Sequence, residues 1–155
     1  MKIKNEYQVW FDAVEITDKT ALDELAAAAT ASAYQKIDCL ACAKCCLTTV
    51  TTFTESDIQR ASKGLSISTK NFKKLYLFMD LDGNYTTQNV PCPFLNLTDH
   101  KCKIYENRPH ACRSFPHTQK DHFLARKRVH LENAKFCGIT TYVLDTLKTN
   151  FTKTR

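Results

Sequence analysis

The chain has 155 residues, of which 43% are hydrophobic and 25% charged, so it has the composition of a folded globular protein and enough length for a hydrophobic core. Only 3 glycines and 4 prolines are present, which argues against a long flexible linker, and no apolar run is long enough to span a bilayer. The formal net charge of +6 and the 8 cysteines are the unusual features, and they direct the search for a function.

The N-terminal stretch MKIKNEYQVWFDAVEITDK lacks the uninterrupted apolar segment of a secretory signal. We therefore expect a cytoplasmic location. In that reducing compartment, clustered cysteines bind metal or perform redox chemistry more often than they form structural disulfides. A disulfide scaffold is the minor alternative, because the case against secretion rests on this one terminus.

The first half of the chain predicts three helices and three short strands. Alanine-rich residues 18–37 indicate a helix capped by Thr17 or Asp18, and the β-branched LTTVTTF predicts a short strand. Thr54 opens a second helix, with Asp57 as in a capping box. Ser68 caps a third helix, and LDGNY predicts a hairpin turn with a strand on each side.

The second half is less regular. Short strands are expected at 94–97 and 101–104, around the turn TDHK, and YENRPHAC suggests a short helix whose start is limited by Pro109. Residues 121–136 read as a basic amphipathic helix, and residues 139–151 as a final helix.

These elements predict an α+β fold: a small single domain, mainly helical with short strands and an irregular cysteine-rich metal-binding centre. We expect an N-terminal helical segment packed on the core (1–38), a cysteine-cluster metal-binding domain (39–137) and a C-terminal helix (138–155).

The octapeptide CLACAKCC at 39–46 holds four of the cysteines. The spacing of Cys39, Cys42 and Cys45 lets one loop wrap three thiolates around one centre. It begins the bacterial ferredoxin pattern, which a distant Cys followed by Pro completes, as Cys92 does here. This pattern favours an iron–sulfur cluster of the [4Fe–4S] type.

Zinc is the competing ion, because a closed zinc site takes four Cys or Cys and His ligands, commonly as two pairs. One pair would come from the octapeptide. The second would come from the downstream cysteines, Cys92, Cys102, Cys112 and Cys137, with His110 and His117 as weaker candidates. Thiolates suit both zinc and iron–sulfur clusters, so ligand softness does not separate them.

Cys45 and Cys46 are adjacent, and neighbouring side chains point in different directions. We therefore expect Cys46 to turn away from the centre that Cys45 joins. The eight cysteines would then form two four-thiolate sites, or one site with the remainder in a second metal site, a redox pair or core packing. Burial as a small apolar side chain is the main alternative for Cys137.

Residues 101–135 carry nine Lys and Arg against three Asp and Glu. A solvated helix face that also offsets the charge of bound thiolates is the favoured interpretation of this excess. An anionic partner, nucleic acid included, is the alternative.

The motifs CLACAKCC, CPFL at 92–95 and CKIYENRPHACRSFP at 102–116 together resemble the YkgJ-like CxxCxxCC family, which is described as chelating zinc or iron. The resemblance implies that the cysteines within these motifs bind metal, and Cys137 is added because it lies near them in the sequence. Arg108 and Arg113 bracket Cys112 and would offset thiolate charge, and Tyr105 would pack beside the site.

Three functions remain in competition. The first is an iron–sulfur protein in electron transfer, sensing or assistance to another enzyme. The second is a structural zinc module that binds a protein or nucleic acid. The third is a protein-modifying enzyme, because flagellin lysine methylases carry a similar cysteine module. No catalytic triad, phosphate-binding loop or pair of catalytic carboxylates is apparent, so a non-enzymatic role is favoured.

Overall fold

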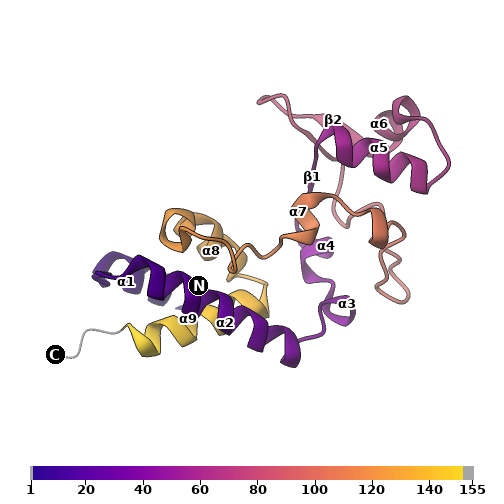
Figure 1. Cartoon of the computed structure of the whole chain (residues 1–155). Coiled ribbons are helices and arrows are strands. Elements are labelled where there is room, and N and C mark those ends of the chain that lie inside the picture. The colour runs from indigo at the N-terminus through magenta and orange to yellow at the C-terminus, as the bar shows by residue number, and fades with distance from the viewer. Residues whose placement is uncertain (1, 152–155) are drawn as a thin grey trace. The chain divides into compact units, whose positions relative to one another are not determined.

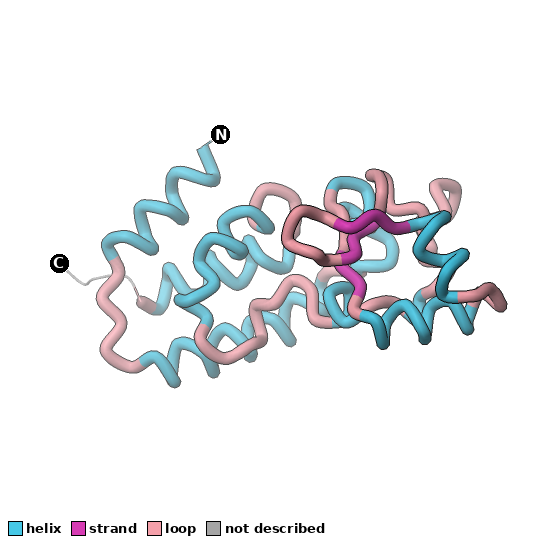
Figure 2. Tube along the Cα trace, turned by 90° about the horizontal axis from the view of Figure 1, so that it is seen from above, coloured by secondary structure: helices cyan, strands magenta, loops and turns pink. Residues whose placement is uncertain are grey.

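The computed structural model describes residues 2–151, with side chains described from residue 6 onward. Helices dominate and one small sheet is present, so the mainly helical α+β class is confirmed (Figure 1, Figure 2). The chain divides into two compact units. The helical unit comprises residues up to Asp38 together with those from Pro116 onward, and the cysteine unit comprises Cys39–Phe115. The domain boundaries expected from the sequence stay a prediction.

The helical unit contains α1 (Lys2–Ala13), α2 (Lys19–Lys36), the 3-10 turn η2 (Phe123–Arg126), α8 (Lys127–Asn133) and α9 (Gly138–Asn150). No helix in residues 2–151 combines the length and the apolar composition that crossing a bilayer requires. The cytoplasmic location stays a prediction.

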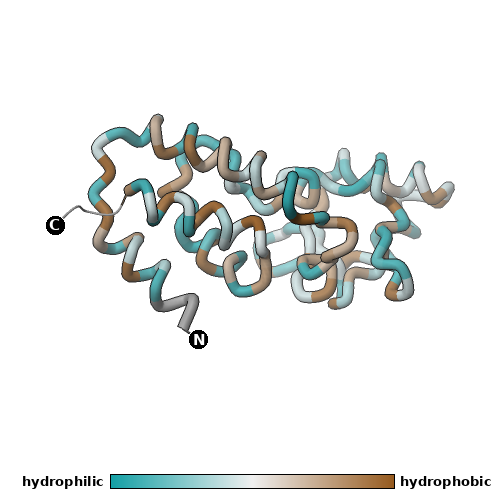
Figure 3. The backbone as a smooth tube through the Cα atoms, turned by 90° about the horizontal axis from the view of Figure 1, so that it is seen from below, coloured by the Kyte–Doolittle hydropathy of each residue, from teal (hydrophilic) through white to brown (hydrophobic). Residues whose placement is uncertain are grey.

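Helix α2 begins where the sequence predicts, because the Asp18 side chain accepts a hydrogen bond from the Ala21 amide at 2.9 Å. Its buried positions recur at helical spacing, and α2 contacts α9 (Figure 1). Hydrophobic positions alternate with hydrophilic ones along these helices (Figure 3). The small side chains on α2 let α9 approach closely. The buried residues are Leu22, Ala26, Ala29, Thr30 and Ala33 on α2, and Ile139, Thr140, Val143, Leu144 and Leu147 on α9.

The single basic helix predicted over 121–136 is wrong in extent. His122 adopts a left-handed backbone conformation with φ of 60°, and the chain then makes the η2 turn before α8 starts. The Asp23 carboxylate accepts the backbone N–H groups of His122 at 2.7 Å and Phe123 at 2.9 Å. This long-range cap sets where the turn begins, and helical periodicity in the sequence does not reveal it.

His130 on α8 is fully buried in the helical unit. Its ring stacks on Phe123 with centroids 4.0 Å apart, and its Nε2 lies 3.2 Å from the Phe123 carbonyl oxygen. Its Nδ1 is buried without a hydrogen-bond partner in the described part of the chain. Burial lowers the pKa of His130 to about 4, the Phe123 carbonyl opposes this shift, and the charges of Arg126 and His117 add to it.

Acidification is therefore expected to destabilise the helical unit between about pH 6.5 and pH 4. An unfolded histidine takes up a proton near pH 6.5 and the folded one only near pH 4. The unfolded state thus binds more protons in this window, and the free energy of unfolding falls as pH falls, by about 3 kcal/mol in total.

Thermal unfolding followed by the fluorescence of Trp10, the only tryptophan and a residue of α1, measures this effect at pH 7.5 and pH 4.5. A His130→Gln variant cannot titrate at this position, so its stability should depend less on pH. Equal pH dependence in wild type and variant would contradict the prediction.

The cysteine unit contains α3 (Cys39–Cys42), α4 (Lys44–Thr48), β1 (Thr52–Phe53), α5 (Glu55–Gly64), α6 (Thr69–Tyr76), β2 (Leu77–Met79), β3 (Tyr85–Thr87), the 3-10 turn η1 (Tyr105–Asn107) and α7 (His110–Arg113). The sheet is antiparallel with the order β1-β3-β2, pairing Phe53 with Tyr85 and Phe78 with Thr86. The caps of α5 and α6 and the hairpin between β2 and β3 are confirmed.

The strands predicted at 94–97 and 101–104 are wrong, because a single bridge between Leu95 and Cys102 is present there. The Leu95 amide bonds back to the Cys92 carbonyl at 3.0 Å, and His100 has a left-handed φ of 59°, so the chain turns too tightly for a ladder. The short helix predicted in YENRPHAC is split, because Pro109 separates η1 from α7.

An aromatic core holds the cysteine unit together. Phe72 is fully buried and stacks on Phe94 with centroids 5.6 Å apart and ring planes 9° apart. Cys92 and Cys102 pack against this core. The hydrophobic core therefore also supports two of the candidate metal ligands. Its buried members are Phe53, Ile58, Ala61, Phe72, Leu77, Phe94 and Ile104.

Candidate metal centre

All eight cysteines are described, and none forms a disulfide. Seven of them belong to the cysteine unit, namely Cys39, Cys42, Cys45, Cys46, Cys92, Cys102 and Cys112. Cys137 belongs to the helical unit, where it is buried and precedes α9. The thiols that the resemblance assigned to metal thus share one unit, whereas a ligand role for Cys137 stays a prediction.

The octapeptide folds as two short helices joined at Ala43. Ala43 is buried and left-handed, with φ of 48°, a conformation that costs a non-glycine residue about 1–2 kcal/mol. The break redirects the chain between Cys42, the last residue of α3, and Cys45 in α4. The backbone is therefore turned between the first two cysteines of the motif and the adjacent pair.

The sulfurs of Cys45 and Cys46 lie 3.9 Å apart, and both side chains are half-buried. The expectation that these two side chains point in different directions is therefore wrong, and their roles at a metal centre stay a prediction. Adjacent residues on a helix differ by about 100°, and side-chain rotation is enough to bring two sulfurs together from that starting point. A hydrogen bond between them lowers the pKa of Cys45 to about 7 and raises that of Cys46.

Cys92 is tied to the adjacent pair through the backbone, because its amide donates to the Cys46 carbonyl at 2.7 Å. Cys102 lies opposite Leu95 in the isolated bridge, and the Lys103 amide donates to the Phe94 carbonyl at 2.8 Å. These backbone hydrogen bonds fix the positions of Cys92 and Cys102, although neither residue lies in a regular strand.

Cys112 lies on α7, which contacts β1 (Figure 1). Its sulfur is 3.3 Å from the Thr51 hydroxyl. Burial raises the pKa of Cys112 to about 11, which the hydrogen bond to Thr51 opposes, and negative charge on Cys92, Cys45 and Cys102 adds to the rise. A thiol in this position gives up its proton readily only when a cation replaces it.

Electrostatic coupling joins five thiols, those of Cys45, Cys46, Cys92, Cys102 and Cys112. Burial is the main cause that raises the pKa of Cys92, and the charges of Cys102 and Cys45 add to it. Negative charge on Cys92 and Cys112 likewise adds to the rise in the pKa of Cys46. Within residues 2–151, however, no three His, Cys, Asp or Glu side chains stand in an arrangement that would hold a metal ion as they are.

Cys39 and Cys42 belong to α3 and lie three residues apart, so they share a helix face. Cys39 is exposed and Cys42 half-buried. The His100 ring contacts this helix, with Nδ1 3.3 Å from the Ala41 carbonyl oxygen. Sequence reasoning overlooked His100, because the contact spans 59 residues and no short motif signals it.

The residues predicted to accompany the thiolates are brought together in part. The Arg108 guanidinium stacks over the Tyr105 ring at 3.8 Å and donates to the Tyr105 carbonyl at 2.7 Å. Burial raises the pKa of Cys102, and the positive charge of Arg108 opposes that rise. Arg113 lies 4.0 Å from the Asp57 carboxylate. As a direct cofactor contact, each of Arg108, Arg113 and Tyr105 stays a prediction.

The donor chemistry fits a thiophilic metal. Five partly buried thiols from three segments repel one another when ionised, and a cation would relieve that repulsion and displace their protons. Zinc and iron both accept such ligands. Of the two histidines proposed as weaker ligands, His110 belongs to the cysteine unit and His117 to the helical unit.

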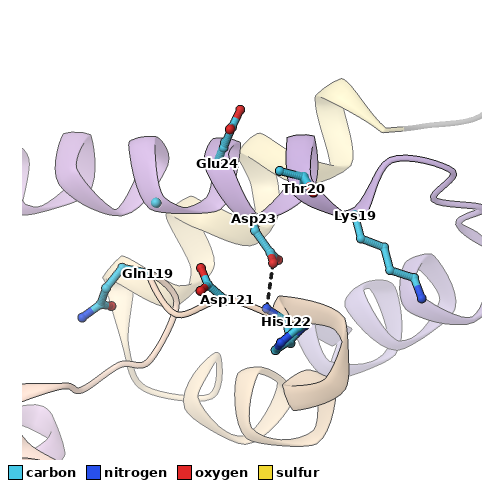
Figure 4. Close-up of a pocket in the computed structure, with 8 residues that line it drawn as sticks. Lys19, Thr20, Asp23, Glu24, Gln119, Asp121 and His122 are labelled. Carbon is cyan, nitrogen blue, oxygen red and sulfur yellow. Dashed lines mark hydrogen bonds between the residues drawn. The ribbon is translucent and has the colours of Figure 1, made fainter.

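The helical unit has a cavity of about 560 Å³ between α2 and the segment before η2 (Figure 4). Its lining is polar, and Asp23 points from α2 to the backbone of His122 (Figure 4). The carboxylate is therefore already used as a cap. The lining residues are Lys19, Thr20, Asp23, Glu24, Ala27, Gln119, Asp121 and His122, and they contain no cysteine.

Comparison with known proteins gives one finding that bears on this site. A family model described as "CxxCxxCC: Putative zinc- or iron-chelating domain" matches residues 38–138, well over half of the chain. The match contains all eight cysteines. No curated protein and no solved structure matches the chain.

Proposed function

Because the chain belongs to the CxxCxxCC family of zinc- or iron-chelating domains, we propose that its cysteine unit is a thiolate metal centre that binds one zinc ion. The observation that carries the proposal is the 3.9 Å separation of the Cys45 and Cys46 sulfurs. With zinc–sulfur bonds of about 2.3 Å, two thiolates on one tetrahedral zinc stand about 3.8 Å apart.

In this proposal, Cys45 and Cys46 supply one ligand pair. Cys112 and one of the two loop thiols, Cys92 or Cys102, supply the other. Bound zinc would be structural, joining α4, the 92–102 loop and α7, and its binding would release protons and weaken as pH falls. With four thiolates supplied, Cys39 and Cys42 would not be needed at this ion.

An iron–sulfur cluster is the second candidate, favoured by the C-x2-C-x2-C spacing and by Pro93 after Cys92. In a [4Fe–4S] cluster each thiolate binds a different iron, so ligand sulfurs stand farther apart than two ligands of one ion. The close pair is therefore better matched to zinc. This cluster would instead use Cys39, Cys42 and Cys45 with a downstream cysteine.

We propose an accessory or regulatory task in the cytoplasm, in which the metal-ordered unit binds a partner protein or nucleic acid. The excess of basic residues over 101–135 supports an anionic partner. These basic residues are divided between the two units, because residues 101–115 belong to the cysteine unit and residues 116–135 to the helical unit. Lys127 and Lys135 are each engaged with a carboxylate, on Asp12 and Glu132.

Metal analysis of anaerobically purified protein tests the proposal. We expect about one zinc per chain, little iron and no visible absorption, since zinc has no d–d transitions. Stoichiometric iron with broad visible absorption that dithionite bleaches would replace zinc by the cluster. A preparation that takes up neither metal after reconstitution would overturn both candidates.

A further inference from the structure

The Asp57 carboxylate is buried in the cysteine unit, with a side chain only 3% exposed. Both of its oxygens are used, and they serve different parts of the unit. We propose that Asp57 is a positioning residue that holds the segment carrying Cys112 in the place where a metal would meet it. This inference rests on the proposed metal centre and goes beyond it by assigning a function to a residue that is not a ligand.

One carboxylate oxygen serves its own helix. Asp57 Oδ2 accepts hydrogen bonds from the Thr54 amide at 3.1 Å and the Thr54 hydroxyl at 2.8 Å, and the Thr54 hydroxyl accepts from the Asp57 amide at 3.2 Å. These contacts form the capping box that starts α5. The need for a cap explains an acidic residue at this position, but it does not explain why the side chain is buried.

The other oxygen reaches the segment that carries Cys112. Asp57 Oδ1 accepts from the His110 amide at 3.1 Å, across 53 positions of the sequence. His110 is the first residue of the four-residue helix α7, and Pro109 before it has no N–H. A helix this short cannot hold itself together, so an external acceptor at its first amide fixes where it starts.

Arg60 extends the same contact to the other side of Pro109. Its Nη2 donates to Asp57 Oδ1 at 2.7 Å and to the Arg108 carbonyl at 3.0 Å. The backbone immediately before and after Pro109 is therefore bonded to one ion pair, whose carboxylate is buried. The fixed φ of proline then leaves this stretch little freedom.

Cys112 follows two residues after this anchor. Its amide donates to the Pro109 carbonyl at 3.0 Å, and its sulfur contacts the Thr51 hydroxyl at 3.3 Å. The position of its sulfur therefore depends on where α7 starts, and Asp57 and Arg60 set that start. Support of this kind around a metal ligand typically changes metal affinity by about 10–100-fold.

A helix cap alone would give a different result, and a pair of variants separates the two roles. Thr54→Ala removes the capping hydroxyl and leaves the contacts of Asp57 with His110 and Arg60 in place. Asp57→Asn removes the carboxylate charge that serves both the α5 cap and the contacts with His110 and Arg60. Asp82→Asn is the control, because Asp82 is exposed in the β2–β3 turn of the same unit.

The first measurement is made on the metal-free, reduced protein: the alkylation rate of Cys112 by iodoacetamide, mapped by peptide mass spectrometry with exposed Cys39 as the internal reference. Asp57→Asn should raise the rate at Cys112 several-fold, whereas Thr54→Ala and Asp82→Asn should leave it unchanged. Arg60→Gln removes the hydrogen bond to the Arg108 carbonyl and keeps the capping box, so it should also raise the alkylation rate at Cys112. It replaces Asp57→Asn as the test variant if Asp57→Asn does not fold.

The second measurement is zinc affinity by chelator competition. We expect a loss of about 10–100-fold in Asp57→Asn, with Thr54→Ala close to wild type although less stable. Equal effects of Thr54→Ala and Asp57→Asn, or unchanged Cys112 alkylation in both Asp57→Asn and Arg60→Gln, would overturn the inference. If wild-type protein binds no zinc, the proposed function fails, and the alkylation rates still decide whether Asp57 positions Cys112.

Discussion

A Cys46→Ser variant is expected to bind zinc more than about 100-fold more weakly than wild type, a larger loss than residues around a ligand normally cause. The reason is the 3.9 Å separation of the two adjacent sulfurs, on which the proposed centre places Cys46 beside Cys45 at one zinc ion. The stability that zinc confers should be lost as well, about 4 kcal/mol when free zinc is 1,000 times the dissociation constant. Chelator competition and thermal unfolding with and without zinc measure both effects.

Thr48→Ala is the matched control, because Thr48 is exposed on the same helix α4 and carries no sulfur. It should leave zinc affinity unchanged. The informative opposite result is a Cys46→Ser variant that keeps its zinc while Cys39→Ser loses it. That outcome would show that the metal ligands follow the C-x2-C-x2-C pattern and that Cys46 is not one of them.

Features that depend on neighbouring residues could be predicted from the sequence. Asp18, Thr54 and Ser68 cap their helices as expected, because a capping side chain bonds to an amide two or three residues away. The hairpin between β2 and β3 follows from Gly83, whose φ of 82° suits a tight turn. Such signals lie within a few residues and need no knowledge of the fold.

Features set by distant residues could not be predicted in this way. The Asp23 cap on η2 and the Asp57 bond to the His110 amide span 99 and 53 positions. The turn of the backbone between Cys42 and Cys45 depends on the break at Ala43, whose left-handed conformation has no signature in an alanine. The sequence motifs thus identified the candidate ligands, while the closeness of the Cys45 and Cys46 sulfurs required the structure.

The electrostatics of the site fall between these cases. The motif placed Arg108 near the thiolates on the argument that a cluster of thiolates needs positive charge nearby. In the structure, burial raises the pKa of Cys102, and the positive charge of Arg108 opposes that rise. The need for positive charge near the thiolates could thus be predicted, but the thiol on which Arg108 acts could not.

A Phe72→Ala variant should lose about 3–5 kcal/mol of unfolding free energy, the usual cost of removing a buried aromatic ring. Phe72 is fully buried and contacts Phe53, Tyr76 and Phe94, so the cavity would open at the centre of the core. Urea unfolding followed by circular dichroism measures the loss.

The same variant should also weaken zinc binding, by about tenfold or more, because the core packs directly behind Cys92 and Cys102. Leu144→Ala in α9 is the matched comparison: it opens a cavity at an equally buried position of the helical unit and should leave zinc affinity unchanged. Unfolding of the helical unit is followed separately by Trp10 fluorescence. If Phe72→Ala destabilised the protein and retained full zinc affinity, the loop cysteines would be held by their backbone hydrogen bonds alone, and the core would have no part in shaping the centre.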